Sequence, residues 1–171
     1  LEHRECDACM MKGDKIFRVV EPNCFKVDDR MKEMEETGVQ MQVLSTIPVL
    51  FNYWAKPLDG FQTSRFFNDH IAATVAKESN HFIGLGTVPL QDVKLAIKEM
   101  ERCVKELRMP GVEIGTNING KNLGEKEFFP FYEAAQELGC SLFIHPWEMM
   151  GESQMEKYWL PWLVGMPAET T

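Results

Sequence analysis

The chain has 171 residues and a formal net charge of −8 at pH 7, with 44% hydrophobic and 26% charged residues. This composition is typical of a globular domain large enough to bury a core, and it excludes an intrinsically disordered chain. The negative charge disfavours nucleic acids and anionic membrane surfaces as partners, because both attract basic proteins. No run of about 18 apolar residues is present, so we expect no membrane-spanning helix.

The cysteines and the two ends of the chain indicate its context. Five cysteines are dispersed at positions 6, 9, 24, 103 and 140, which suits reduced thiols in a cytosolic protein. Cys6 and Cys9 form a C-x-x-C motif near His3, but no second ligand pair for zinc and no strand–helix setting for a redox pair follows, so we favour no function for it. The chain does not begin with Met, and residues 167–171 resemble the opening of a helix. We therefore expect a fragment of a longer protein.

The first 40 residues predict one strand and one helix. Residues 1–14 are polar and show no periodicity, whereas residues 16–20 form a short β-rich run around Arg18. Arg18 is either an exposed arginine on an edge strand or a clamp for a carboxylate, since a guanidinium pairs with carboxylates in a bidentate manner. Residues 28–37 predict a helix, with Asp28 as its N-cap and Gly38 as its C-terminal stop.

From residue 40 onward, strands and helices alternate. Strands are predicted at 40–46, 81–89, 111–117 and 141–145, and helices at 61–77, 91–107 and 125–138, with an aromatic loop at 49–60. Spacings of about 30 residues between strands mark βα units in a parallel sheet. Eight such strands close a barrel of about 250 residues. The chain therefore predicts an α/β fold that is roughly the first half of a (β/α)8 TIM barrel, with exposed parallel edges.

The carboxyl ends of these strands are where such a barrel carries its chemistry. His145 ends the last predicted strand, directly before Pro146. It is a metal ligand, a general base, a substrate contact or a hydrogen-bonded structural histidine, and its position alone leaves these open. In the aromatic tail at 155–165, we expect Trp159 to pack in the core and Trp162 to face a flat ligand beside the site.

Several blocks of the sequence resemble one family. The chain is similar to the aminocarboxymuconate-semialdehyde decarboxylases of the amidohydrolase superfamily, over about residues 12–171, which leaves residues 1–11 as a separate N-terminal segment. The blocks that carry this resemblance are Lys15-Ile16-Phe17-Arg18-Val19-Val20, Leu44-Ser45-Thr46-Ile47-Pro48-Val49, Tyr53-Trp54-Ala55-Lys56-Pro57, Phe143-Ile144-His145-Pro146-Trp147 and Lys157-Tyr158-Trp159-Leu160-Pro161-Trp162-Leu163-Val164-Gly165.

The resemblance implies a zinc-dependent barrel that removes a carboxylate as CO2 without oxidation, acting as a cytosolic homodimer on a small dicarboxylate. In the family this reaction consumes 2-amino-3-carboxymuconate-6-semialdehyde in tryptophan (kynurenine) catabolism and diverts flux from quinolinate and NAD synthesis. His145 matches the middle-strand zinc ligand, and Arg18 matches the arginine that binds a substrate carboxylate. Trp162 matches a tryptophan lining the substrate pocket, and Phe17 and Trp147 are adjacent candidates.

The sequence also departs from the family pattern. The family's H-x-H pair of zinc ligands is not found before residue 12, and the later acid–base histidine and metal-binding aspartate have no counterpart before Thr171. A catalytic zinc needs about three protein ligands, so we expect these 171 residues alone to be inactive. Two alternatives follow: a non-catalytic subunit that binds or modulates a full-length dimer, and a hydrolase of the same superfamily.

Overall fold

A computed structural model of the protein describes residues 2–3 and 8–171. The chain divides into two compact units, Leu1–Gln42 and Val43–Thr171. Cys6 lies outside the described residues, and Cys9 is a buried free thiol.

The first unit opens with an antiparallel sheet of three strands. β1 (Glu2–His3), β2 (Ala8–Lys12) and β3 (Lys15–Val20) pair in that order, with Met10 opposite Arg18. The sequence predicted β3 but left residues 8–12 without structure. That run lacks both β-branched residues and alternation, and pairing with β3 makes it a strand.

A short helical turn, η1 (Pro22–Cys24), leads to helix α1 (Val27–Thr37). The predicted N-cap, Asp28, is wrong, because Lys26 occupies the cap position and Asp28 lies in the first turn. A carboxylate there still interacts favourably with the positive end of the helix dipole. Gly38 ends the helix as predicted, with a left-handed φ of 71° that suits a residue without a Cβ.

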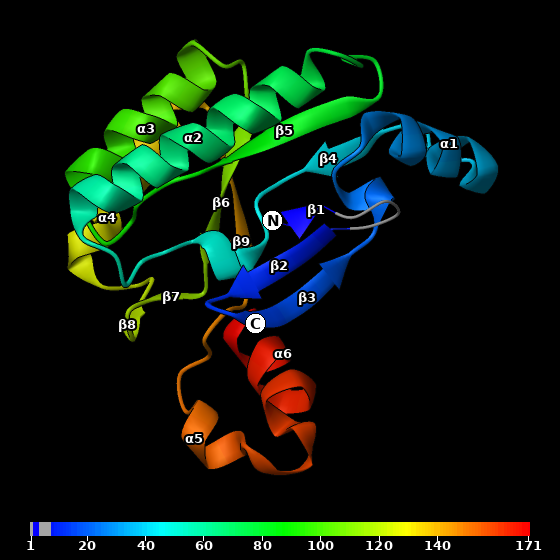
Figure 1. The fold of residues 1–171 in the computed structure, drawn as a ribbon. Helices are drawn as coiled ribbons and strands as arrows, with labels where there is room; N and C mark the ends of the chain where they lie inside the picture. Colours follow the sequence, from blue (N-terminus) through cyan, green and yellow to red (C-terminus); the bar gives the residue numbers. More distant parts are fainter. Residues whose placement is uncertain (1, 4–7) are drawn as a thin grey trace. The chain divides into compact units, whose positions relative to one another are not determined.

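The second unit is built on a four-stranded sheet with the order β4-β5-β6-β9 (Figure 1). Its strands are β4 (Gln42–Leu44), β5 (Phe82–Thr87), β6 (Gly111–Gly115) and β9 (Ser141–His145). The last three run parallel, in the order of the chain. This sheet confirms the predicted partial (β/α)8 barrel.

Three helices connect the strands and cover one face of the sheet (Figure 1). They are α2 (Pro57–Val75), α3 (Val93–Lys105) and α4 (Phe129–Leu138). Short helical turns precede two of them, η2 (Pro48–Leu50) and η3 (Lys126–Phe128). Helix α2 begins four residues before the predicted start, because Pro57 is suited to the first helical turn. The aromatic loop before α2 is correspondingly shorter than predicted.

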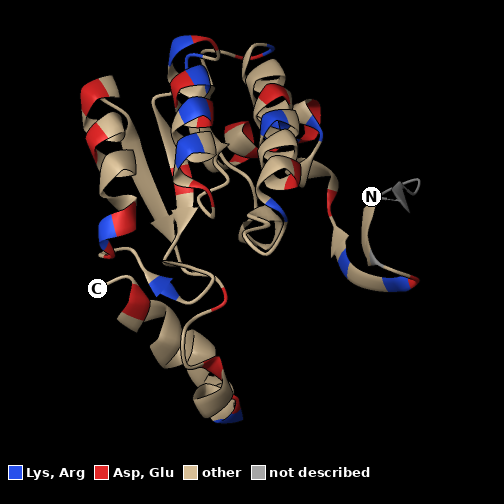
Figure 2. Ribbon diagram, turned by 90° about the vertical axis from the view of Figure 1, so that its left-hand side faces the viewer, with Lys and Arg blue, Asp and Glu red and all other residues tan. Residues whose placement is uncertain are grey.

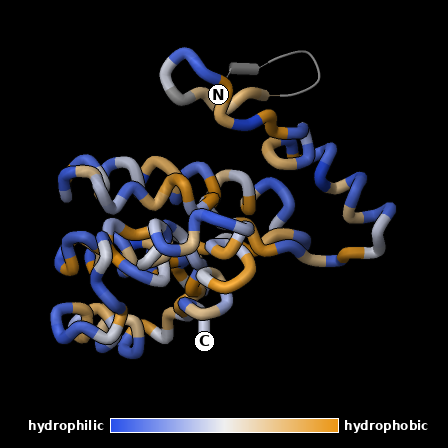
Figure 3. The backbone as a smooth tube through the Cα atoms, turned by 90° about the horizontal axis from the view of Figure 1, so that it is seen from below, coloured by the Kyte–Doolittle hydropathy of each residue, from blue (hydrophilic) through white to orange (hydrophobic). Residues whose placement is uncertain are grey.

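Side chains alternate between the two faces of the sheet. On β6, Val112 and Ile114 are fully buried in the core beneath the helices, so Glu113 and Gly115 point to the opposite, inner face. Figure 3 shows the hydrophobic strand segments that form this core. In the second unit, charged residues lie mainly on helices and loops (Figure 2), and among the strands of the four-stranded sheet only β6 carries an Asp, Glu, Lys or Arg, namely Glu113.

Strand β9 lies at the edge of the four-stranded sheet, and no described strand pairs with its outer side. Phe143 is 50% exposed and Ile144, on the other face, is 45% exposed. In the sheet order β9 is the terminal strand, so it presents unpaired backbone groups together with apolar side chains. This is the exposed parallel edge that the half-barrel prediction entails.

The remaining elements are short. A two-stranded hairpin, β7 (Asn117–Ile118) and β8 (Lys121–Asn122), follows β6. The tail contains α5 (Glu152–Met155), η4 (Lys157–Trp159), the π-helical turn η5 (Pro161–Gly165) and α6 (Met166–Glu169). The prediction that Trp159 packs in the core is wrong, because its side chain is 73% exposed. Trp159 has a left-handed φ and the following Pro161 limits regular helix, so the tail forms short turns. No helix in the described ranges combines the length and apolarity of a membrane span.

Candidate active site at the carboxyl ends of the strands

The parallel register brings the ends of β5, β6 and β9 to one edge of the sheet. Gly115 is the partner of His145, and one layer earlier Thr87 pairs with Glu113. On β5, Gly84 and Gly86 face helices α2 and α3, so Thr87 faces inward beside Glu113. The inner edge therefore carries an imidazole, a carboxyl group and a hydroxyl.

The imidazole of His145 has one ring nitrogen engaged. Its Nδ1 lies 2.9 Å from the carbonyl oxygen of Pro146. A carbonyl only accepts hydrogen bonds, so Nδ1 carries the proton and donates it. In the neutral imidazole Nε2 then keeps its lone pair, which is the state in which a histidine binds a metal ion. The loop that begins at Pro146 thus fixes the tautomer of His145.

Tyr53, from the aromatic loop, closes the end of β6. The backbone N–H of Gly115 donates to the Tyr53 hydroxyl at 3.0 Å, and the Asn119 amide donates to the Tyr53 carbonyl at 2.9 Å. A Cβ on Gly115 would lie 3.1 Å from the tyrosine ring, so glycine is needed for this close approach. Burial raises the pKa of Tyr53, and negative charge on Glu113 raises it further against the effect of the Gly115 hydrogen bond. Tyr53 therefore holds its proton.

Asn117 ties the loop after β6 to the loop after β9. Its Nδ2 donates to the carbonyls of Trp147 and Glu148 at 3.4 and 3.1 Å, and its Oδ1 accepts from Gly120 N–H at 3.0 Å. These groups border a small cavity of about 10 Å³, which Tyr53 also lines. Asn117 thereby sets the backbone of Trp147, two residues after His145.

The tail is fastened to the same edge through Glu169. Its Oε2 accepts from the Thr116 hydroxyl at 2.6 Å and from the Asn117 amide at 3.4 Å, and its Oε1 accepts from the backbone N–H of Met150. One carboxylate thus joins both ends of the segment 150–169 to the end of β6.

Glu113 is the most unusual group on the inner face. Only 1% of the residue is exposed, and among the residues that the structure describes neither its Oε2 nor the neighbouring Thr87 Oγ1 has a hydrogen-bond partner. Burial raises the pKa of Glu113 to about 7, and a hydrogen bond with Ser45 opposes this shift. Sequence reasoning passed over Glu113. The available signal was a single charge within a strand that is otherwise apolar and glycine-rich.

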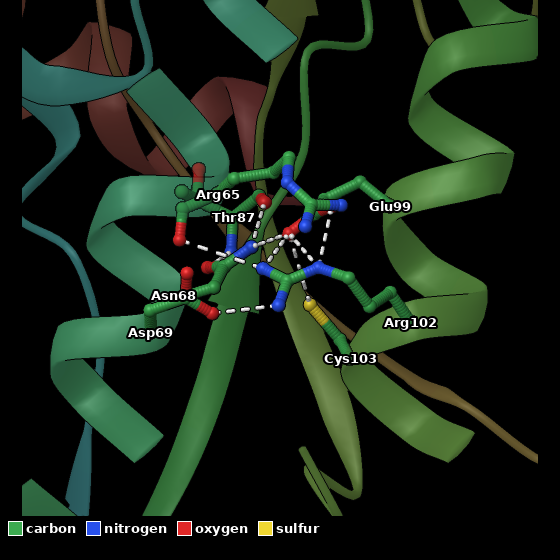
Figure 4. Close-up of polar contacts among 7 residues, drawn as sticks. All are labelled: Arg65, Asn68, Asp69, Thr87, Glu99, Arg102 and Cys103. Atoms are coloured by element: carbon green, nitrogen blue, oxygen red, sulfur yellow. Dashed lines mark hydrogen bonds and ion pairs between the residues drawn. The ribbon is translucent and has the colours of Figure 1, made fainter. Parts of the chain in front are cut away.

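The backbone of Thr87 is held from the helix side (Figure 4). Asn68 Nδ2 donates to the Thr87 carbonyl at 2.9 Å, and Asn68 Oδ1 accepts from the Thr87 N–H at 2.7 Å. Asn68 Nδ2 also donates to Glu99 at 2.8 Å, and Glu99 forms an ion pair with Arg102 at 2.6 Å. Asp69 accepts from the same guanidinium at 2.6 Å. These five residues form what we call the Glu99 network.

The structure brings together some of the residues predicted for the site. His145 and Trp147 lie at the end of β9, as predicted. Trp162 lines a separate pocket in the tail, of about 340 Å³, together with Trp159 and two glutamates. Arg18 and Phe17 are exposed on β3 in the first unit.

A metal site needs more ligands than the described residues provide. Within residues 2–3 and 8–171 there is no group of three or more His, Cys, Asp and Glu side chains that could hold a metal ion. His145 offers a free Nε2, but one imidazole does not fit a catalytic metal, which takes about three protein ligands.

Comparison with known proteins places the chain in a family. The sequence model described as amidohydrolase matches residues 7–171. A 2-amino-3-carboxymuconate-6-semialdehyde decarboxylase from Dictyostelium discoideum is 50% identical over 98% of this chain and 47% of its own length. A protein of the same name from Caenorhabditis elegans is 35% identical over 99% of this chain and 55% of its own length.

A solved structure shows the same fold. The dihydroxybenzoic acid decarboxylase from Polaromonas sp. JS666, crystallised with manganese and the inhibitor 2-nitroresorcinol, is 28% identical. Its TM-score is 0.74, over 84% of this chain and 46% of that one. The chain belongs to the amidohydrolase family of enzymes. It spans about half the length of the curated relatives it matches.

Proposed function

We propose that this chain forms the first half of the barrel of a non-oxidative decarboxylase acting on 2-amino-3-carboxymuconate-6-semialdehyde. The observation that carries the proposal is 50% identity, across nearly the whole chain, to a relative bearing that activity in its name. The reaction replaces a carboxylate by a proton and releases CO2, so it needs no oxidant. It would place the protein in tryptophan catabolism in the cytosol, where the reaction would divert flux from quinolinate and NAD synthesis.

The residue roles follow the family pattern. His145 would bind the metal through Nε2, which its hydrogen bond to Pro146 leaves free. Arg18 would bind a substrate carboxylate, as its guanidinium suits, and Phe17, Trp147 and Trp162 would line the substrate pocket.

We expect zinc as the metal, whereas manganese is present in the related dihydroxybenzoic acid decarboxylase structure. Because the described residues supply one ligand, the remaining ligands would come from other parts of a longer chain, which would act as a homodimer.

The test uses the complete protein, meaning this chain together with the segments that bring it to the length of its relatives. Decay of the semialdehyde chromophore should accelerate with the metal-loaded protein and release one CO2 per substrate. An unchanged decay rate would overturn the proposal. His145→Ala should lower metal content and activity together, while His70→Ala, an exposed histidine on α2, should change neither. Full activity with stoichiometric metal in His145→Ala would contradict the ligand role.

A second candidate is a non-catalytic subunit that binds the full-length dimer. It is favoured by the single metal ligand among the described residues and by the bare edge of β9. The 171-residue chain should then co-purify with a tagged full-length protein. An isolated, aggregating chain would count against it.

A further inference from the structure

Two buried side chains on the inner face have unused hydrogen-bonding capacity. Glu113 Oε2 and Thr87 Oγ1 are both enclosed and both lack a partner among the described residues. The two residues are register partners on neighbouring parallel strands, so their side chains point the same way and lie side by side. A third group lies at the end of the same strand, because the Tyr53 hydroxyl accepts from the N–H of Gly115, two residues after Glu113.

These groups are held in place by their surroundings. The Glu99 network fixes the backbone of Thr87 through both its N–H and its carbonyl. The Tyr53 hydroxyl is bonded to the Gly115 N–H, and Ser45 is the polar neighbour of Glu113. The strand positions of Thr87 and Glu113, which are register partners, keep their side chains on the inner face.

Leaving such groups unpaired is costly. An unsatisfied buried polar atom costs about 1–3 kcal/mol, and more when it is charged. A purely structural carboxyl would find both of its oxygens bonded, as those of Glu99 are. The unpaired oxygen of Glu113 instead faces the side of the sheet that carries His145, where a ligand would bind.

We propose, building on the function proposed above, that Glu113, Thr87 and Tyr53 form a binding subsite for a hydroxyl or amino substituent on the carboxylate-bearing ligand. Glu113 accepts the substituent's hydrogen, and Thr87 and Tyr53 bond to its oxygen or nitrogen. A carboxylate would be repelled from Glu113, so the departing carboxylate lies elsewhere. Both unpaired oxygens are shielded from solvent, so the subsite suits a small substituent.

The subsite predicts a preference that can be measured with simple probes. Benzoate, 2-hydroxybenzoate and 2-aminobenzoate share a carboxylate and differ in one substituent. In calorimetric titrations of the complete, metal-loaded protein, the two substituted probes should bind about 10- to 100-fold more tightly than benzoate. The ratio should fall to about 1 in Glu113→Met, which keeps the side-chain volume and removes the oxygens.

Two further variants keep the test decisive. Thr87→Val retains the shape and the backbone bonds to Asn68, and it should lower the ratio even if Glu113→Met does not fold. Tyr132→Phe, the control, removes a hydroxyl that donates to the Leu123 carbonyl, outside the Glu99 network and the subsite, and should leave the ratio unchanged. Circular dichroism checks folding of every variant.

The outcomes separate this subsite from the proposed function. Turnover of the semialdehyde with equal affinity for the three probes would overturn the subsite alone. A lasting preference without turnover would overturn the proposed function and support the subsite. A preference that survives both Glu113→Met and Thr87→Val, or no binding of any probe, would also overturn the subsite.

Discussion

Two buried glutamates lie on opposite sides of the sheet, Glu99 on helix α3 and Glu113 on strand β6, and their surroundings differ. Glu99, on the helix side, receives hydrogen bonds from Asn68 and Arg102 and lies 3.7 Å from the Arg65 guanidinium. Glu113, on the inner side, has Ser45 as its polar neighbour, and its Oε2 has no partner among the described residues. Burial alone therefore does not distinguish a structural carboxyl from a ligand-binding one. The number of hydrogen-bonding positions that a carboxyl group leaves unused distinguishes the two kinds.

The largest effect should come from breaking the helix-side network. Arg102→Met would remove the guanidinium that is hydrogen-bonded to the fully buried Glu99, and only the more distant Arg65 guanidinium would remain as a counter-charge among the described residues. Removing one partner of a buried pair costs about 3–5 kcal/mol, and urea unfolding of the chain would measure that loss. The exposed pair of Lys105 and Glu101 on the same helix is the control, since Lys105→Met should change stability by less than about 1 kcal/mol. Equal losses in the two variants would contradict a structural role for the network.

On the inner face, stability should depend on pH through Glu113. Its pKa is raised to about 7 by burial, so between about pH 4.5 and 7 the folded state binds more protons than the unfolded state. Stability must then fall as the pH rises through this window, by about 3 kcal/mol at most. Unfolding curves at pH 5 and pH 8 should show this loss for the wild type and a smaller one for Glu113→Gln. An identical pH dependence of stability in both proteins would contradict a raised pKa of Glu113 in the folded state.

A smaller effect should follow from removing the Tyr53 hydroxyl. Tyr53→Phe leaves the buried Gly115 N–H unpaired, at a cost of about 1–2 kcal/mol, and should speed hydrogen exchange at Gly115. Tyr132→Phe is the matched control, because its hydroxyl donates to the Leu123 carbonyl away from the strand ends. Exchange at Gly115 that responds equally to both changes would argue against a local role for Tyr53.

The smallest effect should come from Glu169. Glu169→Gln keeps the side-chain shape but weakens the bonds from Thr116 and Met150, at a cost of about 1 kcal/mol. The tail should loosen while the sheet stays intact, so proteolysis within residues 150–169 should accelerate at an unchanged global unfolding midpoint. A shift of the midpoint would instead show that the tail supports the core.

The sequence predicted the alternation of strands and helices well, because period and spacing are local signals. Residues 141–145 were predicted as a strand and form one with the same bounds. The apolar run between Gly139 and Pro146 is too short for a helix, so a strand is the regular structure that it can form. The predicted roles of Arg18, Trp162 and His145 stay predictions.

Other features could not be read from pattern alone. An amphipathic pattern alone would place the charges of α3 on its outer face, yet Glu99 and Arg102 are buried. Their burial depends on Asn68 and Asp69 arriving from α2, a tertiary arrangement that no local period encodes. Glu113 was likewise missed because its register with Thr87 is set by sheet pairing.

Asn68 constrains which sequences this fold can accept. Its carboxamide offers one donor and one acceptor to the peptide of Thr87, much as a residue on an adjoining strand would. Aspartate lacks the donor, and glutamine places the same group one methylene further out. Substitution at position 68 should therefore be tolerated only alongside changes at position 99. Libraries that vary the two positions together should recover linked pairs rather than independent replacements.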